Sequence, residues 1–193
     1  DGQVFSYRGA SYAIPLLGEH QLHNAATVLE AISVLRKQGW DIDDEAVESG
    51  LYSVAWPARF EVLHTDDPWF VLDGGHNPQC AAALRECLEH YFPDSKRVAL
   101  VGVLKDKDYK SIAATLAPLF DACVCVTPPS ERALPAEELA ELFKGSCREV
   151  CVADTVEDGV DLARDIAQEQ DAMVCAFGSL YICGQIRSCF GLR

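Results

Sequence analysis

From residue 59 onward the chain alternates short apolar runs with segments of helical periodicity, and this alternation restricts the fold more than any other feature. Val98–Val101 is apolar at every position, which is typical of a strand buried on both faces of a sheet. Helices between such strands supply the crossovers that parallel pairing requires. The sequence therefore predicts an α/β fold, with a doubly wound, mostly parallel sheet and helices on both of its faces.

The predicted elements follow from apolar periodicity and from turn-forming residues. The strands are Phe60–His64, Trp69–Leu72, Arg97–Leu104, Ala122–Thr127, Glu149–Ala153 and Ala172–Phe177, with Thr65–Pro68 as a turn. The helices are Pro78–Tyr91, Tyr109–Leu119, Pro135–Phe143, Thr155–Gln168 and Leu180–Cys189.

Residues 1–53 are organised differently. Val4–Tyr7 and Tyr12–Ile14 flank a turn and predict a β-hairpin. Apolar residues then recur at helical spacing over 20–38, and Gly39 is placed to end that helix. A second helix is predicted from Asp44 to about Leu51, with Asp43 as its N-cap. The organisation changes near residue 55.

The chain is acidic, with 16 Lys and Arg against 30 Asp and Glu and a net charge of -14. Such a surface repels phosphate backbones and anionic lipids, so we expect neither nucleic-acid nor membrane binding. The 9 cysteines include no Cys-x-x-Cys motif and are interpreted as reduced core residues of a cytoplasmic protein. Because residue 1 is not Met, we expect a piece of a longer protein.

Ligands of an open parallel sheet bind beyond the carboxyl ends of its strands, and three predicted loops occupy such positions. In Asp73–Asn77, two glycines allow close backbone approach, Asp73 can accept hydrogen bonds, and His76 can donate or accept them. The alternative is that Asp73 and Asn77 only cap the next helix. Lys105–Asp108 carries positive charge or caps a helix through Asp108. Ser179 binds a small substrate or caps a helix.

Three other positions carry polar groups that chemistry could use. Arg59 suits bidentate contact with phosphate or carboxylate, unless it is an ordinary surface residue. His20 and His23 form a weak metal-binding pair without a third ligand, and surface or capping roles are the alternative. Asn24 lies among apolar residues, where a buried amide needs a partner. No metal site is predicted. Gly-x-Gly-x-x-Gly and Gly-Lys are both absent, so the chain lacks a dinucleotide fingerprint and a P-loop.

These segments together resemble the C-terminal portion of the folylpolyglutamate synthase/dihydrofolate synthase family, in the Mur ligase superfamily. The resemblance rests on Leu17–Ala26, Trp56–Glu61 and Leu72–Pro78, with support from Lys105–Tyr109 and Gly178–Tyr181. Two positions depart from the family pattern, since Ala58 replaces a glycine and Gly75 an alanine. The resemblance implies that 54–193 form a Rossmann-like Mur ligase C-terminal domain and that 1–53 are the tail of the central ATPase domain.

The activity that the resemblance implies is ATP-dependent addition of L-glutamate to folate through an acyl phosphate, with dihydrofolate synthesis as an additional activity. It implies that Asn24 contacts the adenine side of ATP, that Arg59 reaches the terminal phosphates, and that Asp73 binds the ribose or nearby polar groups. His76 and Ser179 are implied to bind the incoming glutamate, and Arg59 and His76 are the expected catalytic residues.

The family's P-loop and magnesium ligands belong to an N-terminal ATPase domain. The resemblance therefore implies that ATP and Mg²⁺ are held mainly by that missing partner, and that this chain alone is inactive. The apolar face from Leu22 to Leu35 would pack inside the missing domain, so here it must dock elsewhere, self-associate or lose order. The alternatives are another Mur-type amino-acid ligase and a non-catalytic Rossmann-like binding module.

Overall fold

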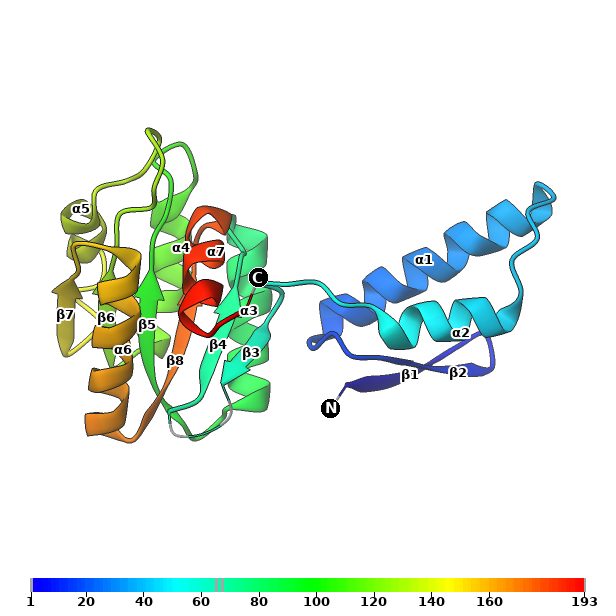
Figure 1. Cartoon of the computed structure of the whole chain (residues 1–193), viewed down its shortest axis with the longest axis horizontal. Helices are drawn as coiled ribbons and strands as arrows, with labels where there is room; N and C mark the ends of the chain where they lie inside the picture. Colours follow the sequence, from blue (N-terminus) through cyan, green and yellow to red (C-terminus); the bar gives the residue numbers. More distant parts are fainter. Residues whose placement is uncertain (1, 65, 67, 193) are drawn as a thin grey trace. The chain divides into compact units, whose positions relative to one another are not determined.

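The computed structural model describes residues 2–64, 66 and 68–192, and the chain divides into two compact units, Asp1–Pro57 and Ala58–Arg193 (Figure 1). The turn predicted at Thr65–Pro68 falls partly outside the described residues. The assignment of residues 1–53 to an ATPase-domain tail stays a prediction.

The first unit is a β-hairpin packed with two helices. β1 (Gln3–Tyr7) and β2 (Ala10–Ile14) pair antiparallel, and α1 (Glu19–Lys37) and α2 (Asp44–Ser53) follow. The carboxylate of Asp43 accepts a hydrogen bond from the backbone N–H of Ala46, so the predicted N-cap is confirmed. The hairpin and both helices are also confirmed.

The apolar face of α1 is covered within this unit. Ala25 and Leu29 are buried in a core with Ile14 of β2 and with Val47 and Leu51 of α2. Of the three outcomes expected for this face, the structure therefore has docking, onto the hairpin and α2. A different side of α1 stays exposed, including Val28 at 47% and Val34 at 50% of their surface.

The second unit is built on a six-stranded sheet of order β3-β4-β8-β5-β6-β7. β3 pairs antiparallel with β4, and all the other neighbours are parallel, as the apolar runs predicted. Every residue of β4, β6 and β8 is buried. The strands are β3 (Glu61–His64), β4 (Phe70–Asp73), β5 (Lys96–Val101), β6 (Ala122–Cys125), β7 (Glu149–Val152) and β8 (Ala172–Phe177).

Helices cover both faces of this sheet, which confirms the doubly wound fold. In Figure 1, α6 and α7 lie on one face, and α3 and α4 lie on the other. Val160, Ile166 and Ile182 of α6 and α7 pack in the main core with sheet residues. The helices are α3 (Pro78–Tyr91), α4 (Tyr109–Leu116), α5 (Ala136–Glu141), α6 (Val156–Gln170) and α7 (Leu180–Cys189), and a 3-10 turn spans Ala117–Leu119.

The strand order identifies a ligand-binding position at the carboxyl ends of β4, β8 and β5. β8 lies between β4 and β5, but α7, which follows β8, lies on the opposite face from α3 and α4, which follow β4 and β5. Chain segments therefore leave the carboxyl ends of these three strands in opposite directions. This is the topological switch point at which open α/β sheets bind their ligands.

Several elements end earlier than predicted. The strand predicted to reach Leu104 ends at Val101, where its registers with β8 and β6 end at Phe177 and Cys125. The next residues stay buried by other bonds: Val103 O accepts from Leu134 N at 3.0 Å, and Leu104 bridges to Ala133. The predicted strand Ala122–Thr127 likewise ends at Cys125. The helix predicted to Leu119 changes to a 3-10 turn at Ala117, and the one predicted over Pro135–Phe143 spans only Ala136–Glu141.

The cysteines are free thiols, and most of them are core residues, as predicted. The buried ones are Cys87, Cys123, Cys125, Cys147, Cys175 and Cys183, whereas Cys80 and Cys151 are half-buried and Cys189 is exposed.

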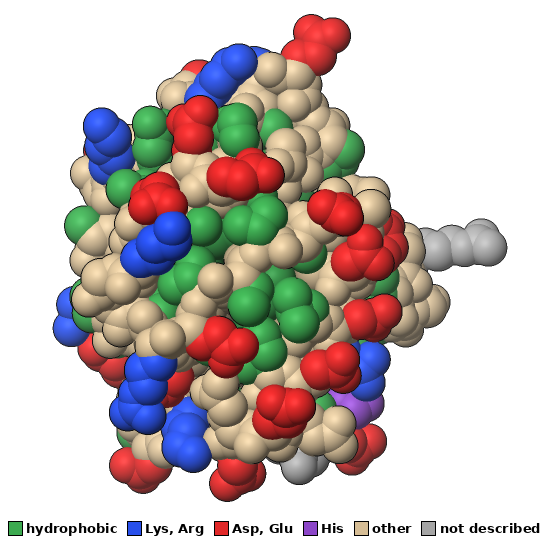
Figure 2. All heavy atoms as spheres, turned by 90° about the vertical axis from the view of Figure 1, so that its left-hand side faces the viewer, with side chains coloured by type: hydrophobic (Ala, Val, Ile, Leu, Met, Phe, Trp, Pro, Cys, Tyr) green, Lys and Arg blue, Asp and Glu red, His purple; other side chains and the backbone are tan. Residues whose placement is uncertain are grey.

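Figure 2 looks onto the β7 end of the second unit, where acidic side chains surround a central hydrophobic area. None of the described helices is both long and apolar enough to cross a bilayer.

Candidate functional site

Two of the predicted loops meet at the carboxyl edge of the sheet. β4 and β8 are parallel neighbours, and Asp73 is level with Phe177 in their register. The loops that follow them touch: a Cβ on Gly74 would lie 2.4 Å from Leu180 Cδ2. Asp73 and His76 from one loop and Ser179 from the other therefore lie at the same edge.

The segment that carries Arg59 is fastened to the same edge. Gly74 N donates to Ala58 O at 2.8 Å, and Phe60 N donates to Asp73 Oδ2 at 2.9 Å. Ala58 and Phe60 on either side of Arg59 have left-handed φ values of 56° and 45°. Non-glycine residues hold this conformation only where surrounding contacts fix it. The structure thus brings Arg59, Asp73, His76 and Ser179 together.

Asp73 shapes both segments. It is only 8% exposed, and its second carboxylate oxygen, Oδ1, accepts from Gly75 N at 2.7 Å. It does not cap α3. Asn77 does so, accepting from Cys80 N at 2.8 Å, so the capping alternative holds for Asn77 and is wrong for Asp73. Asp73 therefore holds the turn before α3 and the segment after Arg59 at once.

His76 is held with a defined ring orientation. Its Nδ1 lies 3.0 Å from Gly74 O, and because a carbonyl only accepts, Nδ1 must carry the proton. The neutral ring therefore presents Nε2 as an acceptor, and the protonated ring presents it as a donor. The side chain is half-buried, and its role toward a ligand stays a prediction.

Ser179 is a helix cap. It is 2% exposed, and its Oγ accepts from Tyr181 N at 3.2 Å in the first turn of α7. Gly178 before it has φ 108°, and a Cβ there would lie 2.7 Å from Gly102 O, so this loop also abuts the end of β5. The capping alternative for Ser179 is confirmed, and its role toward a substrate stays a prediction.

A neutral thiol lies behind this turn. Cys183 Sγ donates to Ser179 O at 3.3 Å. Burial first, and then the charges of Asp73 and Glu61, raise the pKa of the Cys183 thiol to about 12. The thiolate is the reactive form, so Cys183 acts here as a hydrogen-bond donor and not as a nucleophile at neutral pH.

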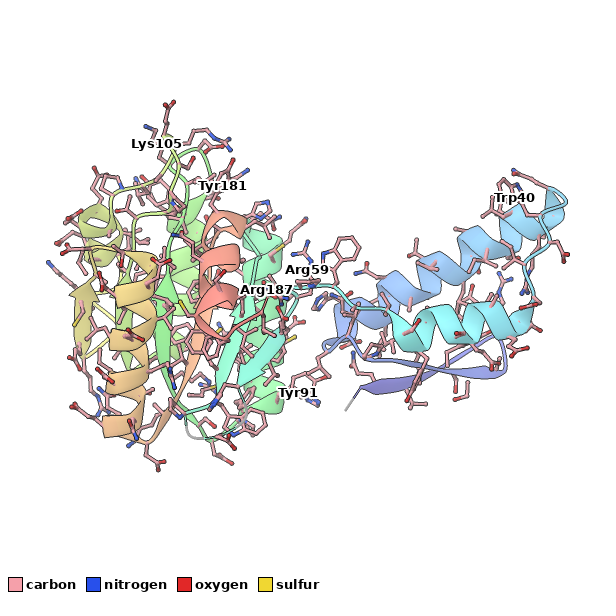
Figure 3. All side chains as sticks on the ribbon, viewed as in Figure 1. Trp40, Arg59, Tyr91, Lys105, Tyr181 and Arg187 are labelled. Carbon is pink, nitrogen blue, oxygen red and sulfur yellow. The ribbon has the colours of Figure 1, made fainter. Side chains whose placement is uncertain are left out.

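The loop after β5 carries positive charge, and Asp108 caps α4 by accepting from Ser111 N at 3.2 Å. Lys105 and Asp108 are exposed. In Figure 3, Lys105 and Tyr181 lie at the same end of the sheet.

Arg132, in the loop after β6, pairs with Asp106 at 3.2 Å. It was not among the residues predicted for the site, because nothing near it in the sequence resembles a motif.

Glu61 stabilises the segment that carries Arg59. Its Oε2 accepts from Ala58 N at 2.8 Å, and its Oε1 forms an ion pair with Arg187 of α7. Both side chains of this pair are largely buried, which favours one fixed geometry. Arg59 and Arg187 are labelled in Figure 3.

Asn24 does not hold the buried amide expected from the sequence, and its contact with ATP stays a prediction. It is exposed on α1, in the first unit, whereas the other four predicted residues are in the second unit. The buried amide is that of its neighbour Gln21, whose Oε1 accepts from Asn24 Nδ2 at 3.0 Å. The sequence pattern therefore predicted a buried amide in the correct part of α1 but assigned it to Asn24 and not to Gln21. Apolar periodicity does not resolve which residue of a helix turn is buried.

The described residues do not form a metal site of their own. Among residues 2–64, 66 and 68–192, no group of three or more His, Cys, Asp and Glu side chains is arranged to hold an ion. His23 instead lies 4.0 Å from Glu19.

A cavity of about 450 Å³ opens in the first unit beside Tyr12, Leu29 and Arg36, and none of the predicted site residues lines it.

Comparison with known proteins identifies the fold that carries this edge. Residues 58–180 match the family model for the Mur ligase, glutamate ligase domain. The chain belongs to the Mur ligase family. This membership favours the ligase interpretations of the sequence over an unrelated binding module. It also agrees with the predicted Rossmann-like sheet.

Individual Mur ligase relatives are similar over almost the whole chain. The dihydrofolate synthase/folylpolyglutamate synthase of Mycobacterium tuberculosis is 35% identical over 98% of the chain, and the folylpolyglutamate synthase of Lacticaseibacillus casei is 31% identical over 96%. The chain spans only 43% of each relative. A crystal structure of Mycobacterium tuberculosis folylpolyglutamate synthase, complexed with ADP and AMPPCP, superposes with a TM-score of 0.89, 32% identity and full coverage of this chain, which spans 46% of that one.

Proposed function

We propose that this chain is the C-terminal part of an ATP-dependent ligase that adds L-glutamate to folate, with dihydropteroate as a further acceptor. The observation that carries this proposal is the shared edge of Arg59, Asp73, His76 and Ser179, within a Mur ligase glutamate ligase domain whose relatives are named folylpolyglutamate synthases.

The reaction joins a carboxylate to an amine. ATP phosphorylates a folate carboxylate and ADP leaves. The amino group of L-glutamate then attacks the acyl phosphate, loses a proton, and displaces inorganic phosphate to form the amide. After phosphorylation, the leaving group of the acyl phosphate is inorganic phosphate, which departs readily. The protein's work is therefore to align the amine with the acyl carbon and to neutralise anionic charge.

The residues of this chain divide that work. The Arg59 guanidinium is the cation for the terminal phosphates, carried by a backbone whose neighbours bond to Asp73 and Gly74. His76 Nε2 and Ser179 face the incoming glutamate, and Asp73 accepts from the ribose or a nearby polar group. Asn24 contacts the adenine side of ATP.

ATP and a divalent cation would be held mainly by a P-loop domain that is the expected partner of this chain. Structures of relatives are described as complexes with ADP and AMPPCP, and with AMPPNP and Mn. A bound Mg²⁺ would neutralise phosphate charge. The described residues of this chain lack a metal cluster. The nine free thiols agree with a cytoplasmic location.

The test is the ATP-dependent incorporation of labelled L-glutamate into folate by the full-length protein and by this chain alone. We expect incorporation by the full-length protein, and neither ATP hydrolysis nor incorporation by residues 1–193. Activity of the chain alone would overturn the division of labour. A full-length protein that used a nucleotide-linked peptide precursor and ignored folate would instead be another Mur-type ligase.

A further inference from the structure

One arginine joins three loops at the carboxyl edge, and the function proposed above gives it no role. Arg132 Nη1 lies 3.2 Å from Asp106 Oδ2 in the loop after β5, and Arg132 Nη2 donates to Tyr181 Oη at 3.3 Å in the first turn of α7. Arg132 itself follows β6. The guanidinium therefore links the loops after β5 and β6 to the helix that begins at Ser179.

The backbone around Arg132 is fixed independently of its side chain. Lys105 N donates to Arg132 O at 2.9 Å, and the flanking residues Ala133 and Leu134 bond to Leu104 and Val103. A change of the Arg132 side chain should therefore leave the loops after β5 and β6 attached to each other. What such a change removes is the connection from these loops to Tyr181.

Tyr181 sits directly beside the cap of α7. Its N–H donates to Ser179 Oγ at 3.2 Å, so its backbone and the Ser179 side chain are parts of one turn. Tyr181 is 48% exposed although its hydroxyl has a polar partner. The ring is held at its hydroxyl end and remains accessible from outside.

The direction of the hydrogen bond decides what Tyr181 can do. Arg132 is only a donor, so Tyr181 Oη accepts this bond, and its own proton is left for another acceptor. The Tyr181 hydroxyl and the amino end of α7 favour an anion, whereas the charge of the Arg132 guanidinium is balanced by Asp106. A carboxylate supplies the acceptor and the charge together.

We propose that Tyr181 is a further substrate-contact residue, donating its phenolic hydrogen bond to a carboxylate of the incoming amino acid, and that Arg132 is the positioning residue that aims it. This rests on the proposed function, and it adds to the predicted glutamate-binding residues one that lies in the Gly178–Tyr181 segment but was given no role there. Asp106 in turn orients Arg132, so the three side chains form a single chain of contacts.

The test uses the full-length protein with the variants Tyr181→Phe, Arg132→Ala, Arg132→Lys and the double variant Arg132→Ala/Tyr181→Phe. Removal of one hydrogen bond to a charged group should raise the KM for L-glutamate by about tenfold or more in Tyr181→Phe, with the KM for ATP unchanged within about twofold. Because Arg132 acts through Tyr181, the double variant should be no worse than the worse single variant. Arg132→Lys should recover part of the loss.

Arg148→Ala is the matched control, since Arg148 is an exposed arginine in the turn before β7, at the opposite end of the strands. An unchanged KM for L-glutamate in Tyr181→Phe overturns the substrate contact, and additive losses in the double variant overturn the positioning role. The unsubstituted protein is measured first. If it adds glutamate while Tyr181→Phe matches it, this proposal alone fails; if it adds none, the proposed function fails as well.

A second measurement reads the contact without catalysis. Hydrogen exchange of the amides in the first turn of α7 is followed in residues 1–193. We expect faster exchange in Arg132→Ala and Tyr181→Phe than in Arg148→Ala, because the turn loses a tether that the control keeps. Equal exchange in all three variants overturns the positioning role.

Discussion

The carboxylate of Asp73 accepts a hydrogen bond from the backbone N–H of Phe60 at 2.9 Å. Phe60 has a left-handed backbone and directly follows Arg59, so this bond sets the course of the chain where Arg59 projects. A buried acid at the end of β4 thereby fixes the backbone next to the cation, through Phe60, which is 13 residues earlier. The position of the cation depends on the fold as much as on the arginine itself.

Asp73→Asn tests this relationship. The amide keeps one acceptor oxygen but turns an NH₂ group toward a backbone N–H, so one buried donor loses its partner. We expect the free energy of unfolding of residues 1–193 to fall by about 1–3 kcal/mol in urea titrations. The exposed Asp94→Asn is the control and should stay within about 0.5 kcal/mol. Equal stability of the two variants would contradict the structural role of Asp73.

Arg59→Ala separates function from stability. Arg59 is half-buried, and the bonds that hold its segment come from the backbone of its neighbours, so the fold should lose less than about 1 kcal/mol. In the full-length protein, loss of a cation at the developing phosphate charge should lower kcat by about 100-fold. Steady-state glutamate addition measures this, with Arg148→Ala as control. A kcat close to that of the unsubstituted protein would remove Arg59 from the site.

Gly178 and Gly184 form a matched pair of glycines around the start of α7. Alanine at Gly178 must adopt φ 108° and place a Cβ 2.7 Å from Gly102 O, so we expect a loss of about 2 kcal/mol or more. Alanine at Gly184, inside α7, meets nothing within 4 Å and should stabilise the chain by about 0.5–1 kcal/mol. Thermal unfolding of both variants measures the contrast, which fails if the two substitutions shift Tm in the same direction.

The buried thiols predict a loss of stability at alkaline pH. Burial first, and then the charge of Asp73, raise the pKa of Cys87 from 9.0 to about 12, and the pKa of Cys183 is also about 12. The unfolded chain loses these protons near pH 9, but the folded chain holds them to about pH 12. Stability from this source is therefore complete below pH 9 and falls as the pH rises through that interval.

Urea midpoints at pH 8, 9, 10 and 11 measure this fall. Cys87→Ala should make the decline shallower, because the unfolded state then has one fewer thiol to ionise. The exposed Cys189→Ala should change the decline less. A decline that Cys87→Ala does not alter would assign the alkaline sensitivity to other groups.

Local signals in the sequence predicted local structure well. Uninterrupted apolar runs such as Val98–Val101 predicted buried parallel strands, because only a strand covered on both faces tolerates apolar side chains at successive positions. Asp43 and Asp108 satisfy backbone donors within three residues, which requires no knowledge of the rest of the fold. The loops at the carboxyl ends of the strands could be named for the same reason.

Contacts between distant segments were not accessible in this way. Arg132 and Tyr181 are 49 residues apart, and Glu61 and Arg187 are 126 apart, and no periodicity links them. The sequence alone determined which segments become strands, helices and edge loops, since those choices rest on burial and capping within a few residues. The tertiary structure alone decided that β8 lies between β4 and β5, because strand order depends on the packing of all the helices at once, and that order brings Arg59, Asp73 and Ser179 to one edge.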